Sequence, residues 1–186
     1  MMERYEILLA GSGGQGLMLA GIILAEAAIL DGKNATHTQS YGPEARGGAS
    51  RSEIIVSDDE IDYPEVSHPD LLLAMTQESA DKYAQQLKDG GTLIIDPLYV
   101  KDLPCVKGTV FKMPITETAR SDVGRDVVSN IVALGVIATA TKVVSERSLE
   151  LAVQGRVPKG TEEMNLKALK AGFALGKRQI QTGVQA

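Results

Sequence analysis

A glycine-rich turn near the N-terminus constrains the fold more than any other feature of the chain. An apolar run at residues 7–10 leads into Gly11-Ser12-Gly13-Gly14-Gln15-Gly16, and an apolar helical run at 17–30 follows at once. A strand that stops at such a turn and restarts as a helix leaves backbone N–H groups pointing one way, at the positive end of the helix dipole. We therefore expect this turn to admit the close approach of an outside group.

The turn resembles a dinucleotide-binding fingerprint, but a second requirement of that fingerprint fails. The spacing of Gly11, Gly13 and Gly16 fits, yet an acidic residue is also needed about 20 residues on, at the end of the second strand, to hold the ribose. That strand is expected at residues 35–39 and closes in Thr38-Gln39-Ser40, whereas Asp31 precedes it. The pattern favours a Rossmann-like fold without a nicotinamide cofactor.

Strand and helix signals alternate along the rest of the chain. This alternation predicts an α/β fold, Rossmann-like, with a mostly parallel sheet and helices on both faces, in a single domain over residues 1–186. At the head of one apolar helix, Ser129 and Asn130 are expected to act as caps. Further strands are expected at 50–56, 70–75, 92–95 and 108–112, and helices at 17–30, 76–88, 127–144, 146–154 and 162–181.

Composition excludes several classes of function. A net charge of −5 without a basic stripe argues against binding to nucleic acid. The longest apolar stretches, at 17–25 and 131–140, are too short to span a bilayer, so we expect no membrane association and a cytoplasmic protein. The single cysteine, Cys105, cannot hold a metal or an iron–sulfur cluster alone. We expect no metal site and no catalytic residue on this chain.

A second loop, Ser40 to Gly48, follows the second expected strand. It is therefore expected at the carboxyl edge of the sheet beside the glycine turn, where ligands and partners dock in open α/β sheets. Arg46 offers a planar fork for a carboxylate or a phosphate. In the alternative interpretation the segment is a surface turn in which Arg46 pairs with Glu44 or Glu53. The expected interface residues are Tyr41, Gly42, Pro43, Glu44, Arg46, Gly47 and Gly48.

Together the two segments resemble the gamma subunit of the 2-oxoacid:ferredoxin oxidoreductases. GSGGQG after the first strand, with SYGPEARGGAS about 25 residues later, carries the resemblance, and the strands at 69–75 and 90–96 and the helix starts at 130–135 and 165–168 extend it. The form GPEARGG resembles the 2-oxoglutarate and branched-chain (2-ketoisovalerate) branches more than the pyruvate branch.

The resemblance implies a multi-subunit enzyme that decarboxylates a 2-oxoacid, passes electrons to ferredoxin and forms an acyl-CoA. Thiamine diphosphate with magnesium is then held by the alpha and beta subunits, and iron–sulfur clusters by cysteine-rich beta or delta subunits. This chain has neither the thiamine signature nor a cysteine cluster, so we expect it to bind no such cofactor and to be inactive alone.

Three roles for the chain remain open. In the first, coenzyme A reaches the assembled enzyme past Gly11, Gly13, Gly14, Gln15, Gly16 and Arg46. In the second, both loops are interface only and the chain is a structural scaffold. In the third, the chain is a stand-alone Rossmann oxidoreductase that binds a flavin or nicotinamide at the glycine turn.

Overall fold

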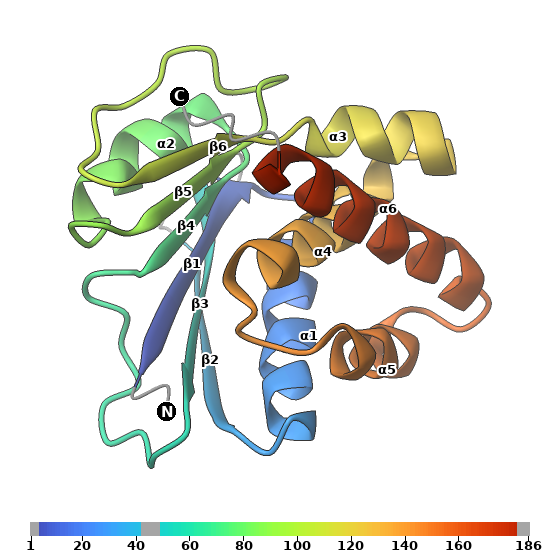
Figure 1. Ribbon diagram of the computed structural model, residues 1–186, viewed down its shortest axis with the longest axis horizontal. Coiled ribbons are helices and arrows are strands. Elements are labelled where there is room, and N and C mark those ends of the chain that lie inside the picture. Colours follow the sequence, from blue (N-terminus) through green and yellow to red (C-terminus); the bar gives the residue numbers. More distant parts are fainter. Residues whose placement is uncertain (1–3, 42–48, 182–186) are drawn as a thin grey trace.

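A six-stranded sheet organises the chain, with strand order β2-β3-β1-β4-β5-β6 (Figure 1). The computed structural model describes residues 4–41 and 49–181. Pairing is parallel from β1 through β4 and β5 to β6, as expected from the alternating pattern, whereas β3 runs antiparallel to both β1 and β2. The strands are β1 (Tyr5–Ser12), β2 (Asn34–Tyr41), β3 (Ala49–Ser57), β4 (Leu71–Ala74), β5 (Thr92–Ile95) and β6 (Thr109–Lys112).

Helices cover both faces of the sheet, which confirms the expected layering (Figure 1). On one face, the short helix α2 and the 3-10 turn after it pack on β1 and β4. The other helices form a thicker layer on the opposite face. The helices are α1 (Leu17–Leu30), α2 (Gln77–Tyr83), α3 (Ile115–Thr118), α4 (Ser129–Thr141), α5 (Glu146–Arg156) and α6 (Glu162–Gln181).

The side chains of β1 divide between two apolar cores. Ile7 and Leu9 belong to the larger core under α1 and α4, whereas Leu8 and Ala10 belong to the smaller core under α2. All four are buried. This alternation follows from the two-residue period of a strand, and continuous apolar runs are typical of strands buried on both faces.

Helix boundaries follow the sequence closely at some points and depart from it at others. α6 spans the expected residues. Thr76 caps α2 through a reciprocal pair of hydrogen bonds with Ser79, but the helix gives way to a 3-10 turn after Tyr83 instead of running to Lys88. α3 and the π-helical turn that follows it, Ala119–Val123, were not expected. Isolated turns of this length carry little hydrophobic periodicity.

Two glycines set the distance between α4 and α6. A Cβ atom at Gly172 would lie 2.2 Å from the carbonyl oxygen of Val132, and one at Gly135 would lie 2.5 Å from that of Leu169. Only glycine at both positions permits this backbone-to-backbone approach. The two helices therefore form one closely packed unit behind the sheet.

We expect Gly172→Ala to lower the free energy of unfolding by about 1–3 kcal/mol, because the added methyl group forces the helices apart. Gly155→Ala on α5 is the matched control, since the nearest atom to a Cβ there is Glu26 Oε1 at 3.9 Å. Alanine is about 1 kcal/mol better than glycine inside a helix, so this control is expected to stabilise the chain. Urea unfolding of both variants measures the difference, and equal effects would contradict the close crossing.

Candidate functional site

The glycine turn joins β1 to α1 at the carboxyl edge of the sheet. Gly14 and Gly16 have φ angles of +89° and +71°, a region that favours glycine. A Cβ atom at Gly11 would lie 2.2 Å from the Gln15 side chain. In contrast, a Cβ at Gly13 or Gly14 would meet nothing within 4 Å. Gly13 and Gly14 therefore present their backbone to the outside of the chain.

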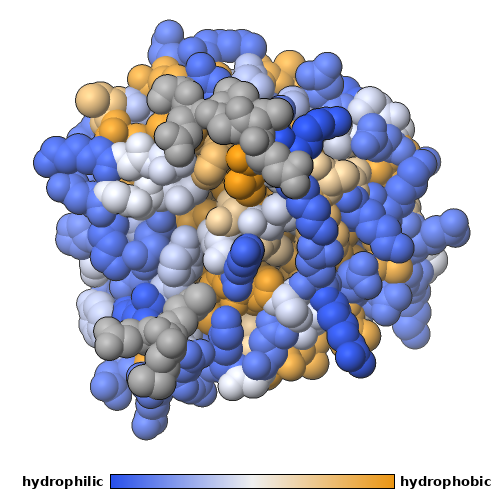
Figure 2. All heavy atoms as spheres, in the orientation of Figure 1, coloured by the Kyte–Doolittle hydropathy of each residue, from blue (hydrophilic) through white to orange (hydrophobic). Residues whose placement is uncertain are grey.

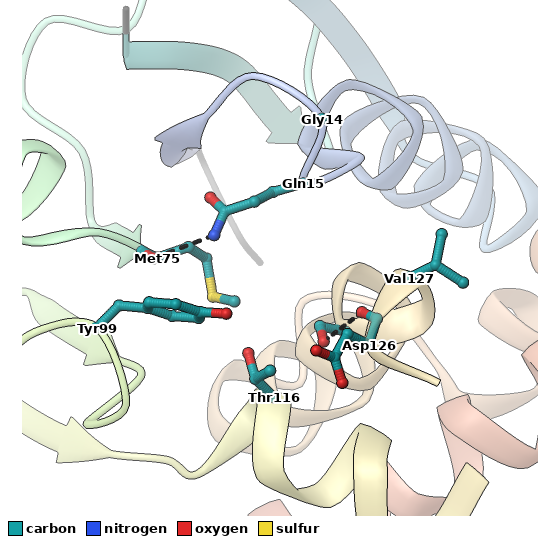
Figure 3. Close-up of a pocket in the computed structure, with 8 residues that line it drawn as sticks. Gly14, Gln15, Met75, Tyr99, Thr116, Asp126 and Val127 are labelled. Atoms are coloured by element: carbon teal, nitrogen blue, oxygen red, sulfur yellow. Dashed lines mark hydrogen bonds between the residues drawn. The ribbon is translucent and has the colours of Figure 1, made fainter. Parts of the chain in front are cut away.

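The Gln15 side chain holds the turn in place. Its Oε1 accepts the N–H of Ser12 at 2.8 Å. Its Nε2 donates to the carbonyl oxygen of Met75 at 3.3 Å, as Figure 3 shows. The amide thus ties the turn to the end of the neighbouring strand β4. Sequence reasoning assigned Gln15 to ligand binding, whereas its amide group is bonded within the chain at both ends.

Asn130 links the turn to the start of α4. Its Nδ2 donates to the carbonyl oxygen of Gly16 at 3.0 Å, and a Cβ at Gly16 would lie 2.6 Å from that nitrogen. The expectation that Ser129 and Asn130 cap α4 was wrong: the N-cap position is Val128, and no side chain caps it. The sequence carries no signal for this role beyond the presence of a polar residue at the start of an apolar helix.

A pocket of about 250 Å³ opens beside the turn (Figure 3). The turn after β1, the residue after β4, the loop after β5, helix α3 and the start of α4 with the turn before it contribute to the pocket. It lies at the carboxyl edge of the sheet, where the sequence analysis expected a site, and that site stays a prediction. Most of the pocket walls come from residues that the sequence did not single out. It is lined by Gly14, Gln15, Met75, Tyr99, Thr116, Asp126, Val127 and Ser129.

The charges near the pocket are already paired. Asp126 accepts two hydrogen bonds from the Arg120 guanidinium, at 2.6 and 2.7 Å, and this contact holds the pKa of the carboxyl below its usual range. The buried Asp96 carboxylate accepts the N–H groups of Leu98 and Thr116. None of the described lining residues is cationic. An anionic ligand would therefore need a cation from elsewhere, such as Arg46 or a partner subunit.

The second predicted loop begins and ends beside the glycine turn. Tyr41, its first expected interface residue, pairs with Ser50, which in turn pairs with Gly11, and Ala49 pairs with Ser12. The remaining predicted residues, Gly42, Pro43, Glu44, Arg46, Gly47 and Gly48, lie outside the described residues. The ends of the loop therefore lie where the sequence analysis expected them, whereas the role of Arg46 stays a prediction.

The sheet order also bears on the dinucleotide interpretation. β3 lies between β1 and β2, so the strand after α1 is not the direct neighbour of β1. In a dinucleotide-binding fold, that neighbouring strand carries the ribose-binding acid at its end. The inserted strand, together with the Gln39-Ser40-Tyr41 ending of β2, argues against a nicotinamide at this turn.

Two other kinds of feature, a metal site and a membrane-spanning helix, are absent from the described residues. They contain no group of three or more His, Cys, Asp or Glu residues arranged to hold a metal, and Cys105 is an exposed free thiol. None of the helices in residues 4–41 and 49–181 combines the length and the hydropathy needed to cross a bilayer.

Comparison with known proteins identifies the family. Residues 6–175 match the model of the pyruvate ferredoxin/flavodoxin oxidoreductase family. The chain belongs to this family. It is 48% identical over 177 residues to the 2-oxoglutarate synthase subunit KorC of Methanocaldococcus jannaschii, a match that covers 94% of this chain and 95% of KorC.

A solved structure and a longer relative extend the comparison. The keto/oxoacid ferredoxin oxidoreductase gamma subunit of Geobacter sulfurreducens superposes with a TM-score of 0.87 at 50% identity, covering 95% of this chain and 98% of that one. The ketoisovalerate oxidoreductase subunit VorA of Methanothermobacter thermautotrophicus is 34% identical over 181 residues, which cover 94% of this chain but 37% of VorA. These findings confirm the predicted gamma-subunit family.

We expect Gln15→Met to lower the free energy of unfolding by about 1 kcal/mol, because the partly buried N–H of Ser12 and carbonyl oxygen of Met75 lose their hydrogen-bond partner. Gln154→Met is the control, since Gln154 is exposed on α5. A surface exchange of this kind changes stability by no more than about 0.5 kcal/mol. Thermal and urea unfolding of both variants measure the difference. Indistinguishable curves would refute the role of the Gln15 amide in holding the turn.

Proposed function

We propose that this chain is the gamma subunit of a 2-oxoglutarate:ferredoxin oxidoreductase, an enzyme that decarboxylates the 2-oxoacid to an acyl-CoA and reduces ferredoxin. The observation that carries the proposal is the match to a 2-oxoglutarate synthase subunit along almost the full length of both chains. Residues 1–186 act as one gamma-type domain in the cytoplasm. Alpha and beta subunits, and in the larger assemblies a delta subunit, are its partners.

The partner subunits supply the redox and carbon chemistry. Thiamine diphosphate, magnesium and the iron–sulfur clusters belong to them, and ferredoxin meets the complex through them. The carboxyl edge of this chain offers exposed backbone at Gly13 and Gly14 and a carboxylate, Asp126, that is already paired with Arg120. The isolated chain is then inert.

Coenzyme A approaches the assembled enzyme along the glycine turn. Gly13 and Gly14 leave their backbone open, the N-terminus of α1 favours a phosphate, and Arg46 on the adjacent loop supplies a fork for it. The alternative is a scaffold whose two loops make only protein contacts. A stand-alone oxidoreductase that binds a flavin or nicotinamide is disfavoured by the strand inserted beside β1.

Reconstitution tests the function itself. The chain is combined with its alpha and beta subunits, and the reduction of ferredoxin is measured with 2-oxoglutarate, a branched-chain oxoacid and pyruvate. We expect activity that requires this chain, and the highest kcat/KM for 2-oxoglutarate. Turnover by the isolated chain, or a flavin or nicotinamide that purifies with it, would refute the proposal.

Two substitutions in the reconstituted enzyme test the route of coenzyme A. We expect Arg46→Ala to raise the KM for coenzyme A about tenfold or more, because a charged hydrogen bond to phosphate is lost. Gly13→Ala raises the same KM without destabilising the chain, since its methyl group meets nothing within 4 Å. Arg51→Ala, which removes a cation paired with Glu53 on β3, is the control.

The scaffold alternative makes a different prediction for the same variants. There, Arg46→Ala weakens the assembly of the subunits and leaves the KM for coenzyme A unchanged. The KM for 2-oxoglutarate is measured in parallel, because only a specific loss of coenzyme A binding separates the two roles.

A further inference from the structure

A second pocket lies beside the edge strand β2, at the opposite end of α1 from the glycine turn. It has a volume of about 490 Å³ and is bounded by α1, β2 and the end of α5. We call it the β2 groove. Its lining residues are Ile22, Ala25, Glu26, Ile29, Leu30, Ala35, His37 and Arg156.

Most of the residues that line the β2 groove are apolar, and two of them are exposed. Ile29 is 58% exposed and Leu30 is 49% exposed, both on the last turn of α1. Helix α1 carries only one charged residue, Glu26, whereas a surface helix ordinarily presents a polar face to water. Figure 2 shows hydrophobic surface in the lower half of the molecule, where α1 lies in Figure 1.

The polar groups of the groove are satisfied within the chain. Glu26 is paired with Arg156. His37 Nε2 lies 2.8 Å from the hydroxyl of Ser52, and burial lowers the pKa of the imidazole, so the ring is neutral at pH 7. The groove therefore offers no unpaired charge from its described lining, and it suits an uncharged, apolar occupant.

The strand that borders the groove has an open edge. β2 is the outermost strand, and no described strand pairs with its outer side. Its eight residues, NATHTQSY, contain no proline, lysine or acidic residue, and its pairing with β3 runs without a bulge. Natural sheets protect an exposed edge with charge, proline or a bulge, or cover it with another segment. β2 has no charged residue, proline or bulge along this edge. Cover by another segment is the remaining means of protection.

The length of VorA bears on the choice of partner for this edge. The same fold makes up 37% of VorA, so more than half of that polypeptide is tethered to it. In KorC of Methanocaldococcus jannaschii, by contrast, the same fold covers 95% of the polypeptide. A subunit of the KorC type therefore has to be held to its partner by surface contacts and not by a covalent tether.

We propose that an extended, apolar segment of this partner subunit pairs with the outer edge of β2 and places alternate side chains in the β2 groove. This inference rests on the proposed function, because the partner belongs to the same oxidoreductase. Strand addition supplies main-chain hydrogen bonds, and pockets for alternate side chains supply specificity. Ile29 and Leu30 then contact the side chains that point toward α1.

Matched lysine substitutions test the surface. Leu30→Lys and Ile29→Lys introduce a charge into the β2 groove, and a lysine in the last turn of a helix is favoured by the helix dipole. Leu151→Lys is the control, because Leu151 on α5 is also 49% exposed and does not line the groove. Unfolding of the free full-length chains first confirms that all three variants fold.

The readout is the affinity of each full-length chain for the other subunits of the oxidoreductase. We expect the two groove variants to weaken assembly at least about tenfold, the loss typical of an interface anchor, and Leu151→Lys to leave it unchanged. Hydrogen exchange gives a second measure: every other amide of β2 is expected to gain protection in the complex.

The outcomes separate this inference from the proposed function. If the wild-type chain joins its partners and the groove variants join them equally well, with β2 amides unprotected, the inference is overturned and the function stands. If the wild-type chain does not bind the other subunits of the oxidoreductase, the proposed function and this inference are both overturned. If the groove variants abolish only self-association of the free chain, the occupant is a second copy and the inference is again overturned.

Discussion

The amide of Gln15 is the contact on which the carboxyl edge of this molecule depends. It accepts from Ser12 and donates to Met75, so one side chain fixes the glycine turn against the adjacent strand. Asn130 completes the arrangement by bonding the carbonyl oxygen of Gly16. With both amides engaged internally, the backbone of Gly13 and Gly14 remains as the open surface of the turn. Held in this way, the turn is organised before any ligand or subunit arrives.

Local sequence was sufficient to predict the parts of the fold that depend on short-range pattern. The turn from β1 into α1, the cap at Thr76 and the span of α6 all follow from glycine, capping chemistry and helical periodicity. The antiparallel course of β3 could not be predicted in the same way. Strand pairing is decided by contacts between residues distant in sequence, and the pattern of apolar residues in a strand does not fix its direction.

The candidate site also has one part that the local sequence predicts and one part that depends on distant contacts. Its location at the carboxyl edge followed from topology, because the turn after the first strand must lie there. The residues that shape the pocket did not, since Tyr99, Thr116 and Asp126 come from three separate segments that only the folded chain brings together. Asn130 illustrates the difficulty, because a polar residue at the head of a helix suggests a cap, yet its partner lies 114 positions away in sequence.

The glycine contact between α4 and α6 has a mechanical consequence. The backbones of the two helices are in direct contact at Gly135 and Gly172. No flexible side chains lie between them at this point, so a shift of one helix along the other would require backbone atoms to overlap. α4 also carries Asn130, so its first turn is fixed both to its neighbouring helix and to the loop after β1. We therefore expect α4, α6 and the turn after β1 to move together as one rigid unit. Adaptation to a neighbouring subunit is left to the segments at the perimeter of the sheet.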